Sequence, residues 1–277
     1  NYGIFLSKGD DTTELKNFHT HTLFCDGKNS AEEVVEAAIE KGFTAIGFSG
    51  HSYTSFDLSY CMTEENTRLY IECINRLKEK YRGKIRIYLG LEADYYAENI
   101  DFNAYDFIIG SVHYIKLGSE YLPVDHSAEW QKRDTEKYFG GSFDSYCEAY
   151  FSLVSDVAEK THADLIGHFD LVTKFNENDC LFSTVTPRYR AAWQKAVDKL
   201  LKYGVPFEIN AGAIARGRRI APYPSAEIAR YITEHGGKLV YSSDCHNKDY
   251  LDCAYDLCTK TYGSFGIVDF EPFIKSR

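Results

Sequence analysis

The sequence has no long apolar run, no closely paired cysteines, no internal repeat and no excess of positive charge. No apolar stretch reaches the ~18 residues of a membrane-spanning helix, so we expect no membrane segment. The eight cysteines lack a C-x-x-C pair and a framework spacing, and no signal peptide is recognisable. We therefore expect reduced thiols and a cytoplasmic location. The net charge of −10 argues against a general binder of nucleic acid or membrane surfaces.

What the chain does contain is ordinary globular composition, with 44% apolar and 26% charged residues among 277. Short apolar runs alternate with amphipathic helical patterns, which predicts a parallel sheet with helices outside it. About seven such units favour a barrel over an open sheet. The expected strands are 15–19, 44–49, 84–91, 106–112, 164–167, 205–209 and 238–243. We expect residues 15–277 to form a single catalytic domain and residues 1–14 to be an N-terminal extension or a processed end.

Helix starts are marked by their capping residues. Ser30 and Glu33 form a capping box, Thr63 precedes a helix whose apolar face would include Leu69, Ile71, Ile74 and Leu77, and Thr186 with Pro187 begins another. Further helices are expected over 142–160, 225–235 and about 249–262. Residues 114–141 and 171–185 are predicted to be loops, the first of them long and lying over the functional face.

Histidines and acidic residues collect where the predicted strands end. Six of the nine histidines and three carboxylates lie there: His19, His21, Asp26, His51, Glu92, His113, His168, Asp244 and His246. Since His19 and His21 are two residues apart on an extended segment, they project to the same side. The alternative to metal binding for an isolated H-x-H motif is a pair of exposed surface histidines. The recurrence at the ends of six of the seven expected strands instead indicates a site at the carboxyl-end mouth of a barrel.

Imidazole and carboxylate together suit Zn²⁺, Mn²⁺ or Fe²⁺, and the lack of thiolate ligands argues against a structural zinc site. Nine side chains exceed the needs of one or two ions and fit three divalent ions with open positions. The positive charge of three divalent ions exceeds the negative charge of three carboxylates and a hydroxide. Such a cluster would therefore attract a phosphate dianion even in an acidic protein. A metal-bound hydroxide would be the nucleophile, because metal binding lowers the pKa of water to about 7.

Six segments then resemble one family. FHTHTxFCDG, GFSGH, GLEAD, GSVH, GHFD and SSDCH occur in the order typical of the PHP (polymerase and histidinol phosphatase) superfamily. The resemblance runs from about residue 15 over nearly the whole chain, and the opening motif is similar to that of the stand-alone histidinol-phosphate phosphatases. It implies a distorted (β/α)7 barrel, an α/β fold, with a trinuclear metal centre at its carboxyl-end mouth.

The resemblance also implies a ligand set. His19, His21, Glu92 and Asp244 would hold the first ion; Glu92 would bridge to the second, completed by His113 and His168; Asp26, His51 and His246 would hold the third. Some family members have a histidine at the position of Asp26. An aspartate there keeps an oxygen ligand and bears on metal preference.

Four further residues are candidates for the chemistry. Asp170 could orient His168, serve as general acid for the leaving alkoxide or anchor a substrate amine. Arg216, Arg218 and Arg219 could be a solvated charge run or bind phosphate, for which a guanidinium is well suited. Arg216 is favoured because it is nearest to the strand end. Tyr53 or Tyr114 could stack on an imidazole-bearing substrate.

The leading hypothesis is a metal-dependent phosphomonoesterase that hydrolyses L-histidinol phosphate to L-histidinol and phosphate in histidine biosynthesis. The alternatives are a PHP phosphoesterase acting on nucleotides or oligonucleotide ends, and a metal-binding domain without turnover. The sequence leaves the oligomeric state open.

Overall fold

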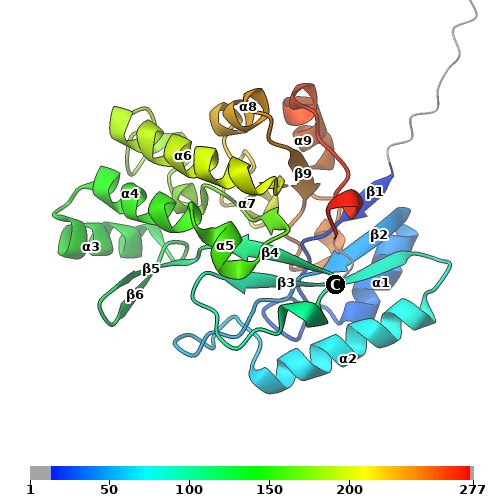
Figure 1. Cartoon of the computed structure of the whole chain (residues 1–277). Coiled ribbons are helices and arrows are strands. Elements are labelled where there is room, and N and C mark those ends of the chain that lie inside the picture. The colour runs from blue at the N-terminus through cyan, green and yellow to red at the C-terminus, as the bar shows by residue number, and fades with distance from the viewer. Residues whose placement is uncertain (1–13, 275–277) are drawn as a thin grey trace, which may run out of the picture.

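The sheet is a nearly closed barrel of parallel strands (Figure 1). The computed structural model describes residues 14–274, so the expectation about residues 1–14 falls almost entirely outside the described residues. The seven strands are neighbours in this order: β1 (Leu15–Asn17), β2 (Phe43–Phe48), β3 (Arg86–Asp94), β4 (Phe107–Ser111), β7 (Leu165–Ile166), β8 (Phe207–Asn210) and β9 (Leu239–Ser242). Beyond the ends of β1 and β9, the amide of His21 donates to the carbonyl of Cys245 at 2.8 Å, which draws the two edges together. The predicted seven-stranded α/β barrel is confirmed.

Helices surround the barrel (Figure 1). They are α1 (Ala31–Glu40), α2 (Glu64–Lys80), α4 (Phe143–Val154), α5 (Val157–Thr161), α6 (Pro187–Leu200), α8 (Ala226–Glu234) and α9 (Tyr255–Tyr262). The capping box of Ser30 and Glu33 is formed at α1, and Thr63 and Thr186 cap α2 and α6. Local side-chain caps satisfy the first amides of a helix, which is why these starts could be located from sequence.

Three details of the predicted helices are wrong. The buried face of α2 is Tyr70, Ile74 and Leu77, which share one face at spacings of four and three, whereas Leu69 is 37% exposed. The helix expected over 142–160 is divided into α4 and α5. The last helix is also shorter than expected, because a 3-10 turn (Lys248–Tyr250) precedes α9.

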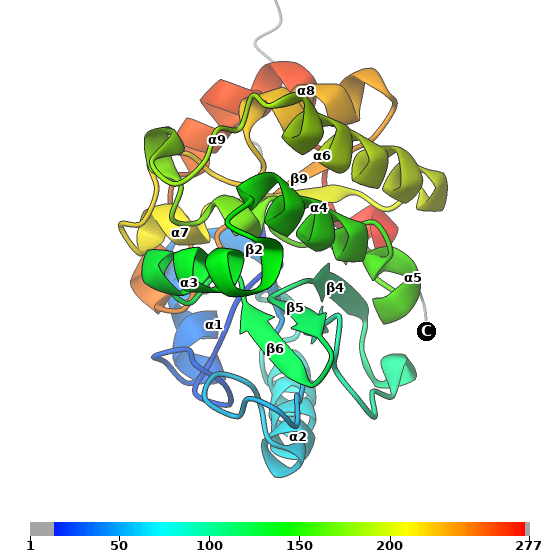
Figure 2. The same cartoon turned by 90° about the vertical axis from the view of Figure 1, so that its left-hand side faces the viewer.

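The segments at the mouth contain more structure than expected. Residues 114–141 form the hairpin β5 (Tyr114–Leu117) and β6 (Glu120–Pro123), then α3 (Ala128–Phe139). Figure 2 shows this hairpin and α3 in front of the barrel. Residues 171–185 contain the 3-10 turns Leu171–Thr173 and Glu177–Asp179, and the short α7 (Gly212–Ala215) follows β8. These elements cover the end where the predicted site residues lie.

The interior below that end is apolar. Phe18, Phe107 and Phe270 form a buried aromatic group with edge-to-face contacts. A Cβ on Gly90 would lie 2.2 Å from the ring of Phe107, so only glycine leaves room for this ring. All eight cysteines are free thiols, as expected. Within residues 14–274, no helix is long and apolar enough to cross a membrane.

Candidate metal centre

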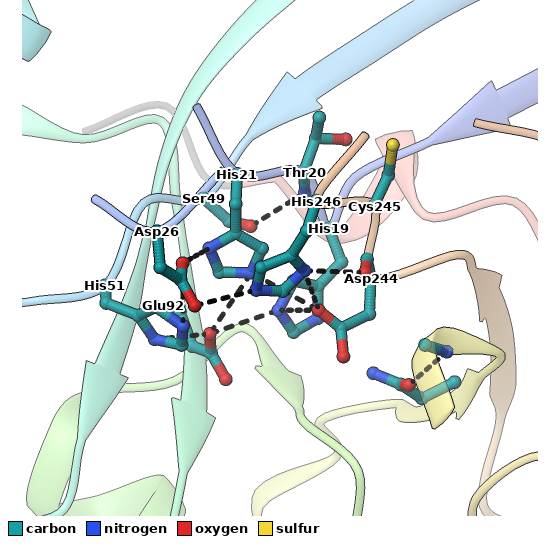
Figure 3. A network of polar contacts seen from close by, with 12 residues as sticks. His19, Thr20, His21, Asp26, Ser49, His51, Glu92, Asp244, Cys245 and His246 are labelled. Carbon is teal, nitrogen blue, oxygen red and sulfur yellow. Dashed lines mark hydrogen bonds and ion pairs between the residues drawn. The ribbon is translucent and has the colours of Figure 1, made fainter. Parts of the chain in front are cut away.

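All nine side chains predicted as metal ligands lie at the carboxyl end of the barrel. His19, His21 and Asp26 follow β1, His51 follows β2, Glu92 lies near the end of β3, His113 follows β4, His168 follows β7, and Asp244 and His246 follow β9. Figure 3 shows the imidazoles and carboxylates of most of these residues directed toward a common centre. The parallel sheet brings together residues that are up to 227 positions apart in the chain, from His19 to His246.

The backbone around Asp244 is held in an unusual conformation. Asp244 has a φ of 48°, in the left-handed region that non-glycine residues seldom adopt. A Cβ on Gly212, at the start of α7, would lie 2.3 Å from Oδ2 of Asp244. The Asp244 side chain therefore packs directly against the backbone of Gly212, and its Oδ1 faces His19 and His21.

The first group of ligand atoms is compact and buried. The Nε2 atom of His19 lies 3.2 Å from Oε2 of Glu92, and Nε2 of His21 lies 3.3 Å from Oδ1 of Asp244. The buried His19 Nε2, His21 Nε2 and Glu92 Oε2 have no hydrogen-bond partner among residues 14–274. Leaving buried polar atoms unpaired costs about 1–3 kcal/mol each, so a cation among them would satisfy all three. The donor set thus fits divalent metal ions.

Glu92 lies between this group and a second one. Its Oε2 faces His19, whereas its Oε1 lies 2.8 Å from Nε2 of His168 and 3.4 Å from Nε2 of His113. Ser111 also donates to Oε1 at 2.7 Å. One oxygen directed at each group is the arrangement that a bridging carboxylate requires.

The third group is centred on Asp26. Its Oδ2 lies 3.2 Å from Nε2 of His246, and its Oδ1 lies 3.6 Å from Nε2 of His51 and 3.8 Å from Nδ1 of His21. The Nδ1 atom of His51 lies 2.9 Å from Glu92, so His51 stands between two groups. The Asp26 side chain is 33% exposed, which makes it more accessible than the other two carboxylates of the cluster.

The protonation states of His21, Glu92 and Asp244 suit metal binding. Burial, together with the nearby His246 and His51, lowers the pKa of His21 to about 3, so its imidazole is neutral at pH 7. Burial alone would raise the pKa values of Glu92 and Asp244. However, the facing histidines, and Arg216 in the case of Asp244, hold both well below the usual range. The carboxylates are therefore ionised and the oxygens available.

Two buried carboxylates that the sequence reasoning did not single out position these ligands. Glu208 on β8 is fully buried, and its Oε1 accepts a hydrogen bond from Nδ1 of His19 at 2.5 Å. Asp94 lies 3.1 Å from Nδ1 of His113. Each contact fixes the tautomer that leaves Nε2 free to bind a metal. A signal was present for Asp94, since it follows Glu92 by two positions on the same strand and so shares its face.

The cluster opens into a cavity of about 180 Å³. Besides ligand residues, its lining contains Tyr60, Tyr114, Asp125, Leu171, Lys174 and Arg216. Of the aromatic candidates, Tyr114 lines this cavity, whereas Tyr53 lines a separate surface pocket.

The three candidate arginines are in different surroundings. Arg216 lines the cavity, and its Nη2 donates to Oδ2 of Asp244 at 3.0 Å. Arg219 does not line the cavity and donates to the hydroxyl of Thr173. Arg218 is exposed to solvent. Of the three, the geometry favours Arg216 for a role with substrate.

Asp170 does not line the cavity. Its Oδ2 accepts a hydrogen bond from the amide of Ser225 at 3.1 Å, and Nδ1 of His168 has no hydrogen-bond partner among residues 14–274. Burial raises the pKa of Asp170, an effect that the nearby Arg219 opposes. This arrangement ties the loop after β7 to the start of α8 and offers no direct hydrogen bond to His168.

Comparisons with known proteins show the family of the chain. The PHP domain model matches residues 17–212. The chain is 28% identical over 273 residues to a protein of Schizosaccharomyces pombe named probable histidinol-phosphatase, covering 90% of this chain and 86% of that protein. It is 27% identical over 266 residues to the histidinol-phosphatase of Bacillus subtilis, covering 88% and 97%.

Among solved structures, the histidinol phosphate phosphatase of Lactococcus lactis subsp. lactis, complexed with zinc, L-histidinol and phosphate, shares the fold. Its TM-score is 0.67 at 19% sequence identity, covering 91% of this chain and 94% of that one. The family model accounts for well over half of the chain and includes seven of the nine clustered side chains. The chain therefore belongs to the PHP domain family.

Proposed function

We propose that this protein is a metal-dependent phosphomonoesterase that hydrolyses L-histidinol phosphate to L-histidinol and phosphate in histidine biosynthesis. The observation that carries the proposal is a largely buried cluster of six imidazoles and three carboxylates that opens into a cavity lined by Arg216 and Lys174. The names of the relatives from Schizosaccharomyces pombe and Bacillus subtilis, and the ligands of the Lactococcus lactis structure, support the substrate.

Three groups of side chains would hold three divalent ions. Their donors are those given above: His19, His21, Glu92 and Asp244; Glu92, His113 and His168; and Asp26, His51 and His246. When bound, the ions would supply positive charge toward the phosphate and lower the pKa of a water molecule to about 7. Zinc in the Lactococcus lactis structure supports a divalent metal, and the number and identity of the ions are part of the proposal.

The protein's own residues would bind and orient the phosphate. Arg216 is held by Asp244 at 3.0 Å, so its guanidinium is fixed in place beside the cluster. A fixed guanidinium can donate two parallel hydrogen bonds to phosphate oxygens and stabilise charge in the transition state. Tyr60, Tyr114 and Leu171 form the less polar part of the wall, where the organic part of the substrate would lie.

The test is the release of phosphate from L-histidinol phosphate by metal-loaded protein, beside p-nitrophenyl phosphate and a panel of nucleoside monophosphates. We expect kcat/KM for L-histidinol phosphate to exceed the other values by at least tenfold. Equal rates on all substrates would refute the substrate and leave the phosphatase chemistry standing. A preference for nucleotides would favour the alternative phosphoesterase, and the absence of turnover would favour a binding domain. A cytoplasmic location stays a prediction from the sequence.

A further inference from the structure

One carboxylate in the cavity has no place in the metal cluster. Four acidic residues line the cavity, and three of them, Asp26, Glu92 and Asp244, belong to the groups described above. The fourth is Asp125, in the segment between β6 and α3. Its negative charge would repel the phosphate of a substrate, so its presence at this wall requires another explanation.

The position of Asp125 is fixed by the surrounding backbone. The amide of its neighbour Val124 donates to the carbonyl of His113 at 2.9 Å, which places Asp125 next to the second group of ligands. The buried side chain of Gln131 on α3 donates to the carbonyls of Val124 at 2.5 Å and Val172 at 3.0 Å. One side chain thus joins the segment that carries Asp125 to the segment that carries Lys174.

Lys174 contacts only one of the two carboxylate oxygens of Asp125. Its Nζ lies 2.9 Å from Oδ2 of Asp125. No hydrogen bond engages Oδ1 of Asp125 within the part of the chain that the structure describes, and the side chain is 30% exposed. A carboxylate has about four lone-pair sites on its two oxygens. Asp125 can therefore keep Lys174 and accept a second cationic donor from the cavity.

The charges in the cavity are arranged with two distinct ends. Arg216 contacts Asp244 and lies 3.0 Å from His246, on the side of the third group. Asp125 and Lys174 lie on the side of His113. A phosphate bound at the cluster and Arg216 would leave the Asp125 end facing the rest of the substrate. In L-histidinol phosphate an ammonium group is two carbon atoms from the ester oxygen, so it would reach that end.

We propose that Asp125, held in place by Lys174, binds the ammonium group of the substrate and selects amino-substituted phosphate esters over other monoesters. The proposal rests on the proposed function and adds a specificity-determining residue to it. A charged hydrogen bond of this kind contributes about 1.5–3 kcal/mol, equivalent to a factor of about 10 to 150 in affinity.

The experiment compares Asp125→Asn with wild type, both loaded with metal. The substrates are L-histidinol phosphate and the matched ester 3-(imidazol-4-yl)propyl phosphate, which lacks the amine. We expect kcat/KM for L-histidinol phosphate to fall about 10- to 100-fold, mainly through KM, and the value for the ester without the amine to change less than about twofold. Binding of L-histidinol, measured by calorimetry, should weaken by a similar factor.

A matched control is Asp57→Asn. Asp57 accepts a hydrogen bond from the hydroxyl of Tyr114 at 2.7 Å but does not itself line the cavity. The variant makes the same charge change, and because it can act only through Tyr114, any change in kcat/KM should be equal for the two esters, so that the preference for the amine stays that of wild type. Asp125→Glu keeps the charge and should restore part of the preference for the amine.

Two results would overturn the proposal. One is an equal loss on both esters by Asp125→Asn, which would show that Asp125 supports the cavity rather than the amine. The other is unchanged binding of L-histidinol. If wild-type protein failed to prefer L-histidinol phosphate, the proposed function would fail separately, and 2-aminoethyl phosphate against ethyl phosphate would still measure the contribution of Asp125.

Discussion

Replacing Glu208 by glutamine should weaken metal binding although Glu208 is too far inside the barrel to line the cavity. Its Oε2 accepts hydrogen bonds from the amide of His168 and the side chain of Asn210, both at 2.8 Å. Its Oε1 faces Nδ1 of His19. Because both neighbours of Oε2 are N–H donors, a glutamine must place its carbonyl oxygen there and direct its NH₂ group at His19.

That orientation changes the tautomer of His19. Facing an NH₂ group, Nδ1 must accept a hydrogen bond, so the proton of a neutral imidazole moves to Nε2, the atom directed at Glu92 and Asp244. The lone pair that the first metal needs is then blocked. Removing such an outer partner of a ligand histidine costs about 10- to 100-fold in metal affinity, or about 1.4–2.7 kcal/mol.

The assay is titration of metal-free Glu208→Gln and wild type with Zn²⁺ or Mn²⁺ by calorimetry, with metal content checked by mass spectrometry. Ser242→Ala is the control, because it removes another partner of the same Oε1 without reversing the bond to His19. We expect this control to bind metal within about threefold of wild type. Equal metal affinity and stoichiometry in Glu208→Gln and wild type would refute the reasoning about the tautomer.

Two further predictions concern residues around the site, and a third concerns an ion pair far from it. Arg216→Met should lower kcat/KM about 10- to 100-fold through loss of charged hydrogen bonds to phosphate. Arg218→Met, at an exposed position, should change kcat/KM less than twofold. If steady-state kinetics gave the same loss of kcat/KM for both variants, the assignment of Arg216 would be contradicted. Asp170→Asn should keep kcat within about threefold, because Asp170 does not line the cavity, while a drop of 10²–10⁴ would identify it as a general acid. Glu271→Gln should lower the free energy of unfolding by about 1 kcal/mol at pH 7. Burial would raise the pKa of Glu271, but hydrogen bonds from Arg86 and Lys16 lower it from 4.5 to about 2. Its contribution is thus complete above about pH 4.5 and is lost as the pH falls through 2, so denaturation curves of variant and wild type should converge toward pH 2.

The barrel was predictable because its signals are local. Helix caps at Ser30, Thr63 and Thr186 depend on side chains a few residues from the amides they satisfy. The seven strands could be recognised as short apolar runs, and parallel strands place their carboxyl ends at one edge. The hairpin β5–β6 was missed although a local signal was present, because its two strands are separated by the two-residue loop Gly118-Ser119. In the structure, the ring of Phe56 contacts Tyr114 on one strand and Tyr121 on the other.

The positions of the side chains around the cluster were less predictable. Asp170 and Arg219 follow strand ends in the sequence, as the predicted metal ligands do, yet neither of them lines the cavity. Glu208, in contrast, is inside a strand and gives no motif, although it contacts His19 directly. Side-chain direction after a strand depends on the loop conformation, and loops here are fixed by contacts with distant segments.

The sequence by itself determined the fold class and the donor atoms, since strand period, helix caps and the recurrence of histidine at strand ends can all be read within short windows. Only the tertiary structure decided which donors face one another, which arginine reaches the cavity and where Asp125 lies. Those are distances between segments far apart in the chain, set by strand order and by buried hydrogen bonds such as those of Gln131 and Glu208. No short window of sequence contains both partners of such a contact.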